Sequence, residues 1–126
     1  MSLLLDTHVV LWLLAGEDRR FGPAALVALR DQSATVSAAT VWEIAIKRRL
    51  GKLRAPTGLV ETVAAAGLQL LSVTALHAEQ VAELPDLHRD PFDRLLVSQA
   101  RLEGLTLVTA DAIVRRYDVS AIDPAA

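Results

Sequence analysis

The sequence of 126 residues contains no cysteine, one methionine and only 4% aromatic residues. Without cysteine, the chain forms neither disulfide bonds nor thiolate metal sites. It has no apolar run of the roughly 20 residues that a membrane-spanning helix needs. Its N-terminus has no basic segment before the leucines, so no signal peptide is expected. These absences favour a cytoplasmic protein.

An excess of positive charge is also missing. The 13 Lys and Arg residues face 15 Asp and Glu residues, which gives a net charge of −2. A protein that coats nucleic acid by charge alone has the opposite balance. Any phosphate-bearing partner must therefore meet a bound cation or a local basic patch. The strongest such patch is KRRLGKLR at residues 47–54, and a solvated helix end explains it equally well.

What the chain does contain is short apolar strands that alternate with helices. This order is typical of βαβ units and a parallel sheet covered on both faces. A single domain over residues 1–126 is expected, with a loose tail at about 122–126. The predicted strands are 2–6, 34–38, 68–73, 105–110 and 119–122. The predicted helices are 7–14, 23–32, 39–51, 57–67, 74–84, 90–104 and 111–117.

Acidic residues stand at the ends of two predicted strands. Asp6 follows the first run of leucines, and Asp111 follows LTLVTA. In an open parallel sheet, the active crevice lies beyond the carboxyl ends of the strands. Asp90 and Asp93 stand at the start of the helix that begins DPFD, and Glu43 stands in mid-helix. We expect these side chains to meet at one edge of the sheet.

Local interpretations of the same residues stay open. Asp90 before Pro91 is a typical helix N-cap, and Asp93 at the third helical position can complete a capping box. Asp6 and Asp111 can likewise stabilise the first turn of the helices that follow them. Taken singly, none of these residues demands a catalytic role.

Glu43 is the least easily explained of the acidic residues, because its neighbours are apolar. Lys47 lies four residues on, so Glu43 fits either an ion pair or a functional ligand. If Glu43 lies close to Asp6, Asp93 and Asp111, the four carboxyl groups cannot all ionise at their usual pKa values. Either some of the pKa values are raised or a cation lies nearby. Carboxylate oxygens favour a hard cation such as Mg²⁺ or Mn²⁺. The set therefore indicates metal-assisted phosphodiester hydrolysis.

Three segments of the chain are familiar in combination. LLDTHVVLWLL, SAATVWEIAIKRRLGKL and HRDPFDRLLVSQARLEGLTLVTAD together resemble the PIN-domain ribonucleases, and closely the VapC-type toxins of bacterial toxin–antitoxin pairs. The resemblance implies a three-layer α/β/α domain with a short, mostly parallel five-stranded sheet and a Mg²⁺ or Mn²⁺ site. It also implies an RNA substrate, a VapB-like antitoxin and a homodimer.

The resemblance assigns roles to individual residues. The four acidic positions of the family match Asp6, Glu43, Asp93 and Asp111, as catalytic metal ligands. Asp90 matches a recurrent residue that we interpret as supporting the site, and the Thr7 hydroxyl is expected to support Asp6. Lys47 shares a helix face with Glu43 and Arg94 follows Asp93, so both are candidate contacts to substrate phosphate.

Two other function classes remain open. One is a catalytically silent PIN-like module that only binds, although the intact acidic set argues against it. The other is a receiver-type phosphoacceptor domain, which needs an aspartate after a central strand and a lysine after a late one. Here Thr74 follows LQLLSV and Asp111 follows LTLVTA, so the receiver pattern fails.

The histidines and tryptophans indicate no site of their own. His8, His77 and His88 contain no pair at the i, i+4 spacing of a zinc helix, so they are interpreted as structural or surface residues. Trp12 and Trp42 stand in apolar helices and are expected in the core rather than as platforms for bases. A dimer or antitoxin surface is the alternative for Trp12.

Overall fold

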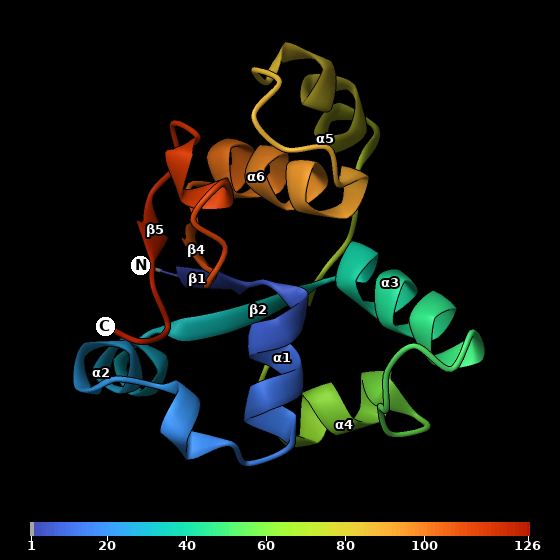
Figure 1. Cartoon of the computed structure of the whole chain (residues 1–126), viewed down its shortest axis with the longest axis vertical. Helices are drawn as coiled ribbons and strands as arrows, with labels where there is room; N and C mark the ends of the chain where they lie inside the picture. Colours follow the sequence, from blue (N-terminus) through green and yellow to red (C-terminus); the bar gives the residue numbers. More distant parts are fainter. Residues whose placement is uncertain (1) are drawn as a thin grey trace.

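The computed structural model describes residues 2–126, which form one five-stranded sheet between helices (Figure 1). The strand order is β3-β2-β1-β4-β5, and every neighbouring pair is parallel. This confirms the predicted short parallel sheet. The strands are β1 (Ser2–Leu5), β2 (Ser33–Ser37), β3 (Gln69–Leu71), β4 (Thr106–Val108) and β5 (Ala121–Ile122).

The helices agree with the predicted ones in order but are shorter at most ends. The predicted helix at 111–117 is a single 3₁₀ turn, and the one at 74–84 divides into α5 and a 3₁₀ turn. Within residues 2–126, no helix is long and apolar enough to cross a membrane. The helices are α1 (Thr7–Leu14), α2 (Pro23–Asp31), α3 (Ala38–Arg49), α4 (Leu59–Ala65), α5 (Ala75–Gln80) and α6 (Pro91–Glu103), with 3₁₀ turns at Asp18–Arg20, Val81–Glu83 and Val114–Arg116.

Alternation along the central strand creates two separate cores. Leu3 and Leu5 belong to the core beneath α1, α2 and α4, whereas Leu4 belongs to the core beneath α6. All three leucines are fully buried, because successive side chains of a strand point to opposite faces. Figure 1 shows α5 and α6 on one side of the sheet, and α1, α2 and α4 on the other. The expected three layers are present.

The position of β1 in the sheet determines where a site can form. β2 and β3 are added on one side of β1, and β4 and β5 are added on the other, so the strand order reverses at β1. A crevice forms beyond the carboxyl ends of the strands at such a point. Asp6 directly follows β1 and therefore stands at its rim.

The C-terminal residues are not the loose tail that the sequence suggested. Gly22 N donates to Pro124 O at 2.9 Å, and Ala25 N donates to Ala126 O at 3.2 Å. The start of α2 has unpaired backbone N–H groups, and the tail supplies acceptors for them. A side chain at position 22 would prevent this, since a Cβ there would lie 2.1 Å from Ala126 O.

Candidate metal centre

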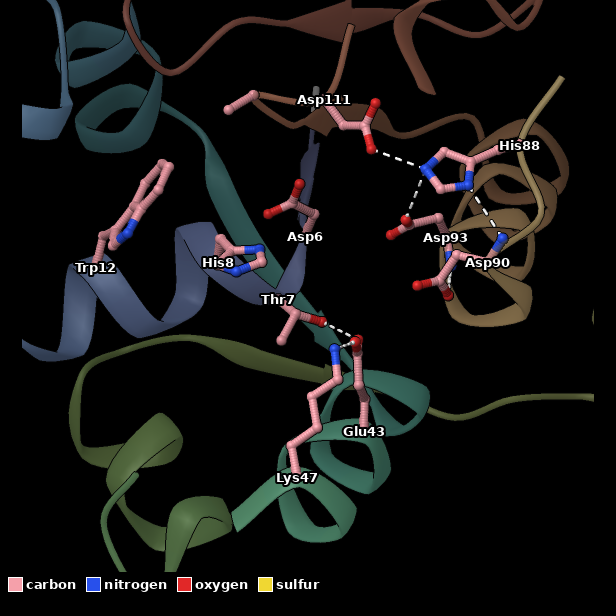
Figure 2. A pocket seen from close by; sticks show the side chains of 11 residues that line it. Asp6, Thr7, His8, Trp12, Glu43, Lys47, His88, Asp90, Asp93 and Asp111 are labelled. Atoms are coloured by element: carbon pink, nitrogen blue, oxygen red, sulfur yellow. Dashed lines mark hydrogen bonds and ion pairs between the residues drawn. The ribbon is translucent and has the colours of Figure 1, made fainter. Parts of the chain in front are cut away.

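A cavity of about 490 Å³ opens at the carboxyl edge of the sheet. It brings together all four predicted metal ligands and also Thr7, Asp90 and Lys47, whereas Arg94 does not line it. Figure 2 shows these side chains converging from β1, α1, α3, the start of α6 and the segment after β4. The lining residues are Asp6, Thr7, His8, Trp12, Glu43, Lys47, His88, Asp90, Asp93, Ala110 and Asp111.

Asp6 combines the two roles that its position allowed. Its Oδ1 accepts a hydrogen bond from Val9 N at 3.0 Å and so caps α1. Its Oδ2 accepts from the Thr109 hydroxyl. The residue is buried, and burial raises the pKa of Asp6 even though both hydrogen bonds act to lower it. The buried carboxylate is therefore held in place but only partly compensated.

Glu43 is buried in mid-helix and has two partners. Thr7 donates its hydroxyl to Oε1, and Lys47 Nζ lies 2.6 Å from Oε2. The hydrogen bond to Glu43 raises the pKa of Lys47. The ion pair that the sequence left open is thus formed. Thr7 supports Glu43 rather than Asp6, because it starts α1 on the side that meets α3.

Asp93 lies in the first turn of α6, where Asp90 forms the cap. Asp90 Oδ1 accepts from Phe92 N at 2.8 Å and from Asp93 N at 3.3 Å. Burial, and next the nearby Asp90 carboxylate, raise the pKa of Asp93 to about 7. The same residue therefore starts a helix and carries a carboxyl group that stays partly protonated at neutral pH.

His88 is a residue of the site that the sequence reasoning missed. Its Nδ1 accepts from Asp90 N at 3.0 Å, which leaves the ring proton on Nε2. Nε2 then donates to Asp111 Oδ2 at 2.8 Å and lies 3.3 Å from Asp93 Oδ2. One imidazole therefore holds two carboxylates from different segments. The sequence signal was its place in HRDPFD, two residues before the helix cap.

Asp111 has the opposite electrostatic behaviour to Asp93. Burial alone would raise its pKa, but the hydrogen bond from His88 and those from Ile113 N and Val114 N lower the pKa of Asp111 below its usual value. The two amides lie 2.8 and 3.4 Å from Asp111 Oδ1. The carboxylate is thus ionised and positioned at the start of the turn after β4.

Thr109, also missed, joins the two sheet-end aspartates. Its hydroxyl donates to Asp6 and accepts from Asp111 N at 3.1 Å. The residue is fully buried and stands in the segment that follows β4. A threonine hydroxyl that accepts from the backbone N–H two residues on is a common turn pattern, so the threonine by itself is only a weak signal for a site residue.

The prediction that Arg94 contacts substrate phosphate is not supported by its position. Its guanidinium donates to the carbonyl oxygens of Pro85, Val81 and Leu84 and to the hydroxyl of Tyr117. It therefore fastens the segment before α6 instead of facing the cavity. Consecutive residues of a helix point in different directions, so Arg94 cannot follow Asp93 into the site.

The tryptophans also differ from the core positions expected of them. Trp42 is 62% exposed and forms a T-shaped pair with Phe92, with ring centroids 5.4 Å apart. Trp12 is partly buried and lines the cavity together with the exposed His8. His77, in contrast, is structural as expected, since it is buried and completes the cap of α5.

The donor set suits a hard divalent cation. Carboxylate oxygens from Asp6, Glu43, Asp93 and Asp111 surround the cavity, and no thiol is present in the chain. His88, Asp93 and Asp111 each offer one ligand atom within 4.8 Å of the others. Burial raises the pKa values of Asp6 and Asp93, and a bound cation would favour the ionised form of both carboxyl groups.

Several solved structures share this fold. The chain is similar to one in VapBC2 from Rickettsia felis bound to a promoter DNA fragment, with a TM-score of 0.72, 16% identity and coverage of 97% of this chain and 98% of that one. A chain in a toxin–antitoxin complex from Klebsiella pneumoniae has a TM-score of 0.66 and 17% identity, with 98% of each chain covered. A chain of FitAcB from Neisseria gonorrhoeae has a TM-score of 0.59 and 21% identity, again with 98% of each chain covered.

Curated protein sequences contain no match to the chain. The family model of the PIN domain, however, matches residues 3–120 and so covers all but the first residue of β1, the described elements from α1 to β4 and every acidic residue of the cavity. This match confirms the resemblance seen in the sequence. The chain belongs to the PIN domain family.

Proposed function

We propose that this PIN-domain protein is a metal-dependent endoribonuclease and the toxin of a toxin–antitoxin pair that acts in the cytoplasm. The observation that carries the proposal is the convergence of four carboxylates, 105 residues apart at the extremes, Asp6 to Asp111, in one cavity. A cavity rich in carboxylates at a sheet edge suits a cation that in turn binds a phosphodiester.

Mg²⁺ or Mn²⁺ would be held by Asp6, Asp93 and Asp111, with Glu43 completing the set. When bound, the ion supplies a Lewis acid that activates water and stabilises charge on the phosphoryl group. Asp93 must release its proton to bind the ion, because its pKa is about 7. His88 positions Asp93 and Asp111, and Thr109 positions Asp6 and Asp111.

Lys47 is the proposed contact to substrate phosphate. Its Nζ reaches the cavity from α3, where it is held by Glu43 at 2.6 Å, and its side chain is 36% exposed. A protonated amine at this place can share its hydrogens between the glutamate and a phosphate oxygen. Thr7 keeps Glu43 in position, and Asp90 keeps α6 in position through its cap.

The proposed partners follow from the solved relatives. The similar chain from Klebsiella pneumoniae comes from a toxin–antitoxin complex, and the one from Rickettsia felis comes from VapBC2 bound to promoter DNA. For this protein we propose a VapB-like antitoxin and a homodimer. Exposed apolar side chains occur on α2, at Leu26 and Val27, and on the other side of the sheet on α5, at Leu76; each is the kind of residue that such a partner covers.

The nuclease proposal is tested by incubating the purified protein with total RNA in Mg²⁺, Mn²⁺ or EDTA and mapping the new ends. We expect cuts at defined positions with either ion and none in EDTA. Binding of RNA without cleavage under all conditions would instead favour the silent binding module.

The toxin proposal needs a separate experiment. Expression of the protein without an antitoxin should arrest the growth of a bacterial host, and Asp6→Asn should relieve the arrest at equal protein level. Equal growth of the two strains would remove the toxin role and leave the nuclease proposal standing.

A further inference from the structure

The cavity is larger than a metal site requires. A hydrated Mg²⁺ with an octahedral shell of waters fills roughly 200 Å³, whereas the cavity holds about 490 Å³. The acidic residues and His88 account for one side of it (Figure 2). Its remaining volume has a wall of different chemistry.

That wall consists of two aromatic rings from α1. His8 and Trp12 are four residues apart, so they lie on the same face of the helix. Their ring centroids are 6.1 Å apart, and the planes are tilted by 43°. Figure 2 shows both rings on the side of Asp6 away from His88. His8 is exposed and both residues line the cavity.

Trp12 packs against two side chains beside the cavity. The Arg20 guanidinium lies 4.8 Å from the centroid of its ring. The buried Phe21 and the indole lie in a T-shaped arrangement, with centroids 6.4 Å apart and planes at 76°. Because these contacts restrict the indole before a ligand arrives, a ligand that stacks there loses less side-chain entropy.

We propose that His8 and Trp12 form a subsite for an unpaired nucleobase beside the metal centre. The inference rests on the proposed nuclease function and adds the part of RNA that is recognised. Unpaired bases stack on aromatic side chains, and every base has a π-face to offer. The cluster of carboxylates would hold the scissile phosphate through the cation, and the rings would hold a base next to it.

Trp42 provides the matched comparison for Trp12. It is the other tryptophan of the chain and is more exposed, at 62%. It does not line the cavity and instead meets Phe92. Exposure alone would favour Trp42 as the platform for a base, whereas the shared cavity favours Trp12.

The two tryptophans allow a direct test by fluorescence. Trp42→Phe leaves Trp12 as the sole tryptophan, and Trp12→Phe leaves Trp42. Each protein is titrated in Mg²⁺ with the four nucleoside 5′-monophosphates and with ribose 5-phosphate. These probes contain no phosphodiester bond, so none is cut.

We expect saturable quenching of Trp12 by the nucleotides and none by ribose 5-phosphate, with no saturable quenching of Trp42. His8→Ala, at an exposed position, should weaken nucleotide binding in the protein that retains only Trp12. Equal responses to nucleotide and ribose 5-phosphate, or saturable quenching of Trp42 alone, would overturn the subsite.

Steady-state cleavage provides the second readout. Trp12→Leu should raise KM for single-stranded RNA roughly tenfold with little change in kcat, and Trp12→Phe, which keeps an aromatic ring, should recover part of that loss. RNA cleavage without any nucleotide-dependent quenching of Trp12 would remove the subsite but keep the nuclease. Nucleotide-dependent quenching of Trp12 without RNA cleavage would keep the subsite and remove the nuclease.

Discussion

Asp6 and Glu43 are buried and come from the first half of the chain, whereas Asp93 and Asp111 are partly exposed and come from the second. The first pair has separate partners: Thr109 and Val9 for Asp6, Thr7 and Lys47 for Glu43. The second pair shares one partner, His88.

This difference separates a fixed half of the cluster from an adjustable one. In the fixed half, Lys47 compensates Glu43. Hydrogen bonds from Val9 and Thr109 hold Asp6 in place, although burial raises the pKa of Asp6. Asp93 shares the His88 imidazole with Asp111, and the pKa of Asp93 is about 7. We infer that the fixed half defines the place of the cation, and that the adjustable half responds most to its arrival.

Breaking the fixed half should have the largest effect. Asp6→Asn preserves the cap of α1, because the amide oxygen can still accept from Val9 N, but it removes a charge from the metal site. We expect no detectable RNA cleavage at the same folded fraction as wild type. Asp118→Asn, at an exposed position outside the cavity, is the control and should cut normally.

Removal of His88, which contacts both carboxylates of the adjustable half, should have the next largest effect. His88→Ala releases Asp93 and Asp111 from their shared donor. Loss of a residue that orients metal ligands costs about 10–100-fold in metal affinity or activity, and we expect a loss in this range in Mg²⁺ affinity measured by calorimetry. Arg89→Ala is exposed and adjacent, and should bind Mg²⁺ as wild type does. Unchanged affinity in both variants would remove the positioning role of His88.

The pH dependence of metal binding sharpens the same comparison. Mg²⁺ must displace the Asp93 proton, and a pKa of about 7 means that most of the molecules carry that proton at pH 6. We expect Mg²⁺ affinity to be about tenfold lower at pH 6 than at pH 8. An Mg²⁺ affinity that stays the same from pH 6 to pH 8 would show that the ion does not displace the Asp93 proton.

The metal-free protein should respond to pH in the opposite direction. Between the unfolded value of 3.8 and about 7, the folded state binds more protons than the unfolded state through Asp93, so this group's contribution to stability falls as the pH rises. The raised pKa of Asp6 acts in the same direction. The lowered pKa of Asp111 adds stability above 3.8 that is lost only at lower pH.

The smallest predicted effects are opposite shifts of melting temperature in EDTA at pH 8. Asp93→Asn removes a poorly compensated charge and should raise the melting temperature by roughly 3–6 °C. Glu43→Gln breaks the pair with Lys47, which solvent partly screens, and should lower it by roughly 4 °C, for a cost of about 1 kcal/mol. Shifts of the same sign would contradict the division into two halves.

The sequence predicted the features that depend on local signals and on strand direction. Asp90 and Pro91 marked the start of α6, and Gly104 marked its end. The parallel topology then placed Asp6 and Asp111 at one edge. The only local signal for His88 was its place two residues before the cap of α6. That signal does not predict where the imidazole points, because the loop is held by a hydrogen bond from His88 N to the distant Tyr117 hydroxyl at 2.9 Å.

Arg94 and Trp42 show why neighbours in the sequence do not define the direction of a side chain. Arg94 follows Asp93, but adjacent residues of a helix face different ways, and Arg94 does not line the cavity. The helix of Trp42 is apolar, yet Glu43 next to it is the buried residue and Trp42 is exposed. In both cases the angular position on the helix determines where the side chain lies, and the composition of the helix does not.

The hydrogen bond from Thr109 to Asp6 joins residues 103 positions apart. During synthesis Asp6 emerges long before β4 and Thr109, so it lacks this partner until residues 106–109 have been made. Contacts between distant residues also slow folding. The cavity is therefore assembled only when the segment from β4 to Asp111 has left the ribosome, and a molecule synthesised only as far as α6 carries no complete metal site.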